Sequence, residues 1–89
     1  MSKELFPLGQ VVATPGAAAL MTDDVAADFL YRHITGDWGE LDQEDKASND
    51  RAVQDGLRIL SEYSYNGNKF WVITEWDRSV TTILLPDEY

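Results

Sequence analysis

The sequence predicts an α+β domain, in which a short strand and two to three helices precede a three-stranded antiparallel meander that packs on them. Apolar residues recur at helical spacing over residues 25–34. Residues 57–64 and 70–75 read as strands, and the Asn66-Gly67 pair between them is the strongest short-range signal for a hairpin. Helices followed by consecutive hairpin strands are typical of the α+β class.

The length of 89 residues indicates a single domain, residues 1–89. Within it we expect a strand-and-helix half at 8–56 and the meander at 57–86. The hydrophobic fraction of 44% is ordinary for a globular protein and argues against disorder.

The helical half carries a start signal before each expected helix. Residues 8–13 read as a short strand, after which Thr14 can cap a helix whose first residue is Pro15. Thr22 can cap a second helix, with acidic residues in its first turn, and Gly36 ends it. Asp42 can cap a third helix, which we expect to run to about Asp55 and to end at Gly56, with a thin apolar face.

The Asn66-Gly67 turn fixes the register of the meander, so that Tyr63 faces Phe70. One sheet face should pack on the helices: Leu57, Ile59, Tyr63, Phe70, Val72, Ile83 and Leu85. We also expect Trp76 in the core on this side. The other face holds Leu60, Trp71, Ile73, Val80 and Leu84 among charged residues, with Arg58 paired to Glu75. Either this face is an exposed apolar patch for a partner, or the N-terminal segment folds over it.

Charge and composition exclude several classes of function. The net charge of −9, concentrated in the N-terminal half, repels phosphate backbones and anionic lipid, so we expect no direct nucleic-acid binding and no membrane association. The chain lacks cysteine, which excludes disulfides and thiolate zinc sites. With no signal peptide or membrane span in sight, we expect a cytoplasmic protein.

No catalytic constellation is visible, and we predict no cofactor and no metal site. His33 is the only histidine, and a packing or capping role fits it better than ligation of a metal. Glu62, Glu75 and Asp77 could be arranged as paired carboxylates, but Arg58 would hold the pKa of Glu75 down, which does not suit a general acid. The sequence leaves enzymatic activity open and favours a non-enzyme.

Two groups of residues are candidates for binding a partner. The first is the acidic connection and the start of the third helix, where Trp38 is either core or an exposed anchor: Asp37, Trp38, Glu40, Asp42, Glu44 and Asp45. The second is the apolar part of the outer sheet face: Leu60, Trp71, Ile73 and Leu84.

Two stretches resemble a family of small bacterial proteins carried on plasmids and other mobile elements, some of whose members are described as restriction-modification subunits. They are Arg32-His33-x-x-Gly36-Asp37-Trp38-Gly39-Glu40-Leu41 and the C-terminal run from Val72 through Leu85-Pro86 to Glu88-Tyr89; the Val11-Val12-Ala13-Thr14-Pro15-Gly16 start is also similar. The resemblance implies no catalytic residues. The order of elements is also similar to RelE-type toxin ribonucleases, at the level of fold alone.

Three hypotheses follow. The first is an acidic interaction protein of a mobile element that binds a host nucleic-acid enzyme, as an anti-restriction or anti-defence factor whose acids imitate DNA phosphates. The second is a divergent RelE-like ribonuclease that uses Arg58, Lys69, Arg78 and a tyrosine. The third is a homodimer sealed by the outer sheet face.

Overall fold

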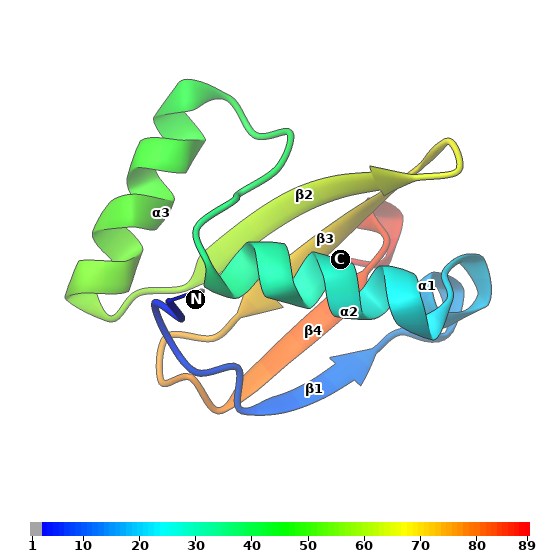
Figure 1. Ribbon diagram of the computed structural model, residues 1–89, viewed down its shortest axis with the longest axis horizontal. Coiled ribbons are helices and arrows are strands. Elements are labelled where there is room, and N and C mark those ends of the chain that lie inside the picture. Colours follow the sequence, from blue (N-terminus) through cyan, green and yellow to red (C-terminus); the bar gives the residue numbers. More distant parts are fainter. Residues whose placement is uncertain (1–2) are drawn as a thin grey trace.

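A computed structural model describes residues 3–89 and confirms the α+β fold (Figure 1). The elements along the chain are β1 (Gln10–Ala13), α1 (Pro15–Leu20), α2 (Asp23–Ile34), α3 (Gln43–Asp55), β2 (Ile59–Tyr65), β3 (Asn68–Thr74), β4 (Val80–Leu84) and a 3₁₀ turn, η1 (Pro86–Glu88). The strands form one sheet in the order β1-β4-β3-β2.

The predicted meander and its register are confirmed. Tyr63 lies opposite Phe70 and Val72 lies opposite Ile83 in antiparallel ladders. Asn66 and Gly67 both have positive φ, 54° and 81°, which is the geometry that a two-residue hairpin turn of this hand requires.

The first strand extends the meander into a mixed sheet. It pairs in parallel with β4, with Gln10 opposite Val80. The N–H of Gln10 donates to the carbonyl of Ser79 and that of Thr14 to the carbonyl of Ile83. The strand is therefore an edge of the sheet, next to the last strand of the chain.

Each predicted helix start is confirmed by a side-chain cap. The Thr14 and Thr22 hydroxyls accept the N–H groups of Ala17 and Val25, which are otherwise unpaired at a helix start. Asp42 accepts the N–H of Asp45 at 2.8 Å. The third helix ends at Gly56, as expected, in the left-handed conformation with φ 67°.

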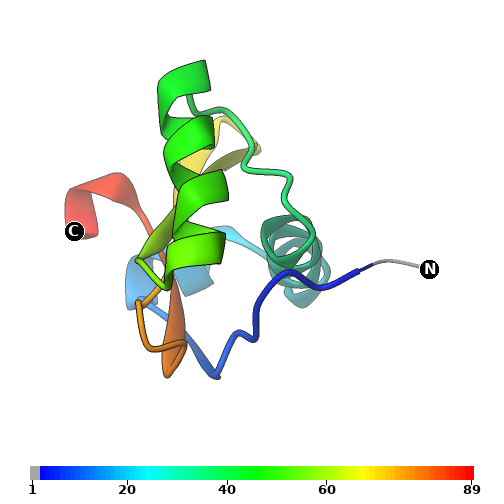
Figure 2. The same cartoon turned by 90° about the vertical axis from the view of Figure 1, so that its left-hand side faces the viewer.

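The second helix covers one face of the sheet, and the C-terminal turn lies on the opposite side (Figure 2). Phe29 of α2 stacks on Tyr63 with ring centroids 5.1 Å apart and also contacts Phe70. The main core forms between α1, α2 and this face, from Ala17, Phe29, Tyr63, Phe70, Val72 and Ile83. Burial of these aromatic and branched side chains is the main stabilising term.

A second core cluster joins the N-terminal segment and α3 to the sheet. It contains Phe6, Trp38, Ala52 and Ile59. Phe6 contacts Trp38 and the ring of His33, and the N–H of Leu5 donates to the carbonyl of Ile34 at the end of α2. The N-terminal segment thus packs on the helical side of the sheet, so the alternative in which it covers the outer face is wrong.

Two residues expected on the packed face are exposed. Trp76, which we expected in the core, is 66% exposed, and Leu57 is 53% exposed. The N–H of Glu75 donates to the carbonyl of Val80, so Trp76 belongs to the loop between β3 and β4. Strand alternation does not continue into this loop, which is why the face assignment fails at Trp76. In residues 3–89, no helix has both the length and the apolar character needed to cross a membrane.

Candidate interaction surfaces

The only histidine lies at the centre of a buried polar network. His33 is fully buried, and its Nδ1 lies 2.6 Å from the Ser61 hydroxyl and its Nε2 2.9 Å from the Thr74 hydroxyl. The Thr74 hydroxyl lies 2.7 Å from that of Thr81, which donates to the carbonyl of Leu8. The predicted packing role of His33 is confirmed. The ring also joins α2 to β2 and β3 directly, and through Thr74 to β4 and the segment at Leu8.

Proton counting assigns the tautomer of this histidine. Because Thr81 donates its proton to Leu8, it must accept from Thr74, and Thr74 must then accept from Nε2–H of His33. The Nδ1 atom therefore accepts from Ser61. A neutral ring satisfies all these groups. Burial disfavours the charged form of the ring and, together with the positive charge of Arg78, lowers the pKa of His33 to about 3.

Two of the predicted acidic residues, Asp37 and Asp42, have structural roles. Asp37 Oδ2 accepts from Arg32 Nε at 2.8 Å, which lowers the pKa of Asp37, and its Oδ1 accepts the N–H of Gly39. Asp42 is occupied as the cap of α3, through the N–H of Asp45. Both side chains shape the connection between α2 and α3, and neither carboxylate is wholly available to a partner.

Glu40 belongs to an ion-pair group on the outer sheet face. Its Oε1 accepts from Lys69 Nζ at 2.9 Å and from the Ser64 hydroxyl, and these contacts lower the pKa of Glu40. Lys69 also contacts Glu62, which accepts from the indole N–H of Trp71. The acid predicted as a partner contact is thus partly neutralised within the chain.

Asp45, from the acidic group of predicted partner contacts, lies close to Leu60, from the apolar group. Asp45 and Leu60 line the same hollow of about 210 Å³ between α3 and β2, with Leu41, Ser48 and Asn49. Glu44 and Asp45 are both exposed in the first turn of α3. This hollow combines negative charge with apolar surface, and the sequence did not predict it because its two sides are distant in the chain.

Trp38 is core rather than an exposed anchor. It is 3% exposed, and its indole N–H donates to Asp50 Oδ1 at 3.0 Å. Its carbonyl accepts the N–H of Glu62, while the N–H of Glu40 donates back to the carbonyl of Glu62. The residue therefore cannot present its ring to a partner in this conformation.

The outer sheet face is not the open apolar patch that the sequence allowed. Ile73 and Leu84 are only 4% and 5% exposed, so these two candidate contacts are buried by their own chain. The C-terminal turn returns over this face, and the ring of Tyr89 packs edge-on against Trp71. Leu60 and Trp71 remain half-buried.

The cations proposed for a ribonuclease site do not all converge: Arg58 and Arg78 both contact Glu75, but Lys69 lies apart from them. Arg58 forms the expected pair with Glu75, with Nη2 and Oε2 3.2 Å apart, whereas Lys69 lies opposite Ser64 near the other end of the hairpin. Arg78 donates to the carbonyls of Leu57 and Ala52. Over residues 3–89, no group of three or more His, Asp or Glu side chains is placed to hold a metal ion.

Part of the sheet edge at β2 is covered by the chain itself. The side-chain amide of Asn49 donates to the carbonyl of Leu60 at 2.7 Å and accepts its N–H, and residues 38–40 bond the backbone of Glu62. Gly39 makes this approach possible, because a Cβ there would lie 1.9 Å from the Glu62 carbonyl oxygen and its φ is +79°.

Comparison of the chain with protein-family models, with curated proteins and with solved structures finds no match.

Proposed function

We propose that this protein is a non-enzymatic interaction protein of a mobile element, which binds a basic surface of a host protein through the acidic first turn of α3 and the hollow beside it. The observation that carries the proposal is the composition of that hollow: Asp45 and the adjacent Glu44 supply charge, and Leu41 and Leu60 supply apolar surface. A charged rim beside an apolar centre is the usual anatomy of a protein interface.

Four of the seven cations are held by contacts within the chain, each ion pair also occupying an acid, while Lys46 and Arg51 lie on α3 itself. Arg32, Arg58 and Lys69 are ion-paired within the chain, and Arg78 is occupied by backbone carbonyls. Much of the positive charge is therefore neutralised or held inside the fold, while the net charge stays at −9. Such a field attracts basic surfaces and speeds encounter with them, and it repels nucleic acid.

A nucleic-acid enzyme of the host is the partner that this chemistry fits best. The DNA-binding surface of such an enzyme is basic, so an acidic protein can occupy it as a competitor. In this version the protein acts as an anti-restriction or anti-defence factor, in agreement with the resemblance to proteins of mobile elements.

The test is affinity capture of a host nucleic-acid enzyme, followed by titration of the purified pair over a range of salt concentration. We expect binding at 50 mM salt that weakens steeply toward 500 mM, because the Debye length falls from roughly 14 to 4 Å over that range. Binding that does not respond to salt would refute the charge-based mechanism, and so would failure to capture any basic partner at low salt.

Two matched double variants locate the surface. Glu44→Gln with Asp45→Asn removes two charges at the hollow and keeps the Asp42 cap, whereas Asp55→Asn with Asp87→Asn removes the same charge elsewhere. We expect roughly a tenfold or greater loss of affinity for the first variant and at most about twofold for the second, since close charge pairs dominate over distant ones. Equal losses would show that net charge alone, and not this surface, governs binding.

A further inference from the structure

The two edges of the sheet differ in how far the rest of the chain covers their backbone groups. The β2 edge is covered at Leu60 by Asn49 and at Glu62 by residues 38–40, whereas β1 is exposed along its whole length. Because Gln10 and Thr14 direct their N–H groups at β4, strand alternation directs the N–H and C=O groups of Val11 and Ala13 outward. Within residues 3–89, no hydrogen-bond partner lies at these outward groups.

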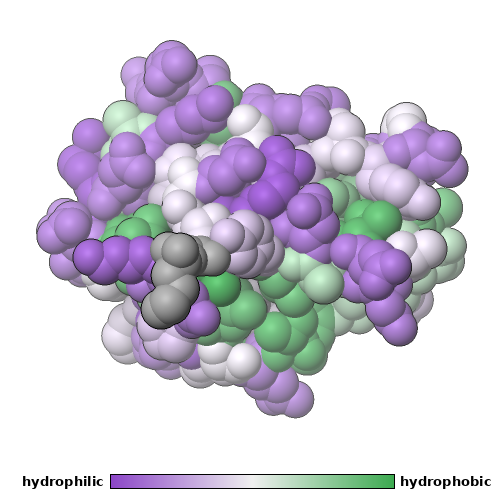
Figure 3. All heavy atoms as spheres, in the orientation of Figure 1, coloured by the Kyte–Doolittle hydropathy of each residue, from purple (hydrophilic) through white to green (hydrophobic). Residues whose placement is uncertain are grey.

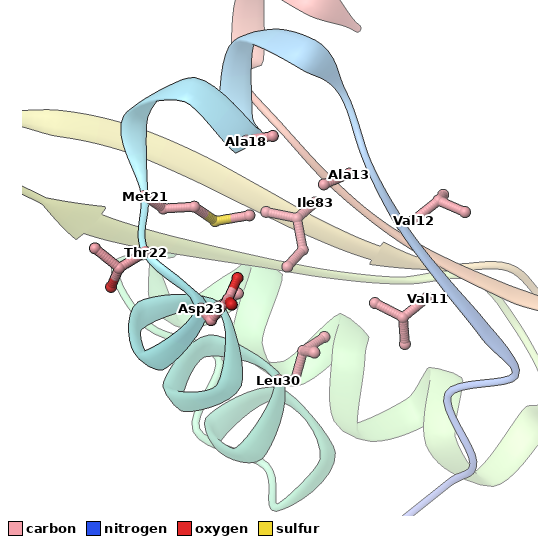
Figure 4. Close-up of a pocket in the computed structure, with 10 residues that line it drawn as sticks. Val11, Val12, Ala13, Ala18, Met21, Thr22, Asp23, Leu30 and Ile83 are labelled. Carbon is pink, nitrogen blue, oxygen red and sulfur yellow. The ribbon is translucent and has the colours of Figure 1, made fainter.

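A groove runs beside this open edge, between β1 and α2 (Figure 4). Met21 and Ile83 point toward one another across it, and Val11 lies across from Leu30. Its volume is about 230 Å³, and the lining is mostly apolar: Val11, Val12, Ala13, Ala18, Met21, Thr22, Asp23, Ala26, Leu30 and Ile83. Sites for drug-sized molecules are larger, roughly 300–1,000 Å³, so the groove suits one or two side chains rather than a small molecule.

Apolar surface is exposed around the same edge. Val11 is 43% exposed and Val12 38% exposed. In the space-filling view, hydrophobic atoms gather below α2, over the region of β1 (Figure 3). Edge strands are commonly protected by lysine, proline or a bulge, and residues 10–13 contain no lysine or proline.

We propose that the β1 edge and its groove dock an extended segment of a partner protein, in which apolar residues alternate with polar ones and lysine or arginine flanks them. The segment would add a strand to the sheet through the outward groups of Val11 and Ala13, with one apolar side chain in the groove. This inference is independent of the proposed function, since it concerns the opposite edge of the sheet from the α3 hollow.

Charge selects this occupant over a second copy of the chain. Asp23 is the charged residue of the groove lining, and it stands at the start of α2, where a basic flank of the bound segment would reach it. Pairing of β1 with β1 would bring together two chains of net charge −9, and like charges at such distances repel. The negative charge of the protein therefore attracts a segment with basic flanks and repels a second copy of the chain.

The test is titration of the whole protein with a capped peptide, Lys-Lys-Val-Thr-Val-Thr-Lys-Lys, monitored through its backbone amide resonances. We expect the largest shifts at Val11, Ala13, Asp23 and Leu30, and none at Leu60. Shifts confined to the α3 hollow, or no binding, would overturn the docking site. A dimer in sedimentation whose interface maps to Val11 and Ala13 would overturn the choice of occupant in favour of a second copy.

Two variants of one residue separate strand addition from simple contact. Ala13→Pro removes an outward N–H at an edge position where proline is tolerated, and Ala13→Val keeps it. Loss of one hydrogen bond should weaken peptide binding roughly two- to tenfold in Ala13→Pro and leave Ala13→Val within about twofold. Equal affinity of the two variants would refute strand addition. If Ala13→Pro does not fold, the backbone amide shifts of the unmodified protein with the peptide test strand addition instead.

A matched peptide with glutamate in place of lysine tests the charge of the occupant. We expect it to bind at least about tenfold more weakly than the lysine peptide at low salt, with the difference shrinking at high salt. Equal binding of the two peptides would overturn the assignment of a basic partner segment.

Discussion

Acidification should destabilise this protein well before its carboxylates are protonated, because of one buried ring. His33 is fully buried and neutral, held between the Ser61 and Thr74 hydroxyls, and its pKa is lowered to about 3. In the unfolded chain the same ring has a pKa of about 6.5. Between these two values the unfolded state binds a proton that the folded state does not bind, so stability falls as the pH falls.

The size of the effect follows from the two pKa values. The free energy of unfolding should fall with a limiting slope of about 1.4 kcal/mol per pH unit below the unfolded pKa. From pH 8 to pH 5 the loss integrates to about 2 kcal/mol, which for a domain of this size corresponds to roughly 8–16 °C in Tm. His33 is the only histidine, and histidine is the side chain whose ordinary pKa lies inside this window.

Two measurements check this reasoning. Urea unfolding at pH 8 and pH 5 gives the free-energy difference, and the imidazole resonances of the folded protein give the pKa of His33 directly. A His33→Gln variant is the control: it should be less stable at pH 8 and show little further loss by pH 5. A folded-state pKa of 6 or above, or equal stability of the unmodified protein at both pH values, would refute the buried neutral assignment.

Two substitutions test the packing at the β2 edge and in the β3–β4 loop. Gly39→Ala places a Cβ 1.9 Å from the carbonyl oxygen of Glu62 at a φ of +79°, and should cost about 3 kcal/mol or more in urea unfolding; a cost below about 1 kcal/mol would contradict the close approach. Trp76→Lys should change stability by less than about 0.5 kcal/mol because the side chain is 66% exposed. A loss above about 2 kcal/mol would show that Trp76 is part of the core.

Local signals explain why so much of the fold could be predicted. Thr14, Thr22 and Asp42 cap helices through bonds that span three residues, and Asn66-Gly67 sets the hairpin register within a few residues. Caps and tight turns act over a single turn of chain, so their chemistry is visible in the sequence. The Arg58–Glu75 pair followed from that register and is present.

The candidate sites were predicted less well, because exposure depends on segments that are distant in the chain. Trp38 is buried by Phe6 and bonded to Asp50, and Ile73 and Leu84 lie on a face over which the C-terminal turn returns. Alternation assigns a side chain to a face of a strand but does not say what covers that face.

The sequence by itself determined the class of the fold, the helix starts, the meander with its register and the acidic character of the surface, because propensity, caps, turns and charge are properties of residues and their near neighbours. Only the tertiary structure decided that β1 joins the sheet beside β4, that Asn49 covers part of one edge, and that Asp45 meets Leu60 across a hollow. These features depend on how distant segments close on one another to bury apolar surface, and that closure is a property of the whole chain.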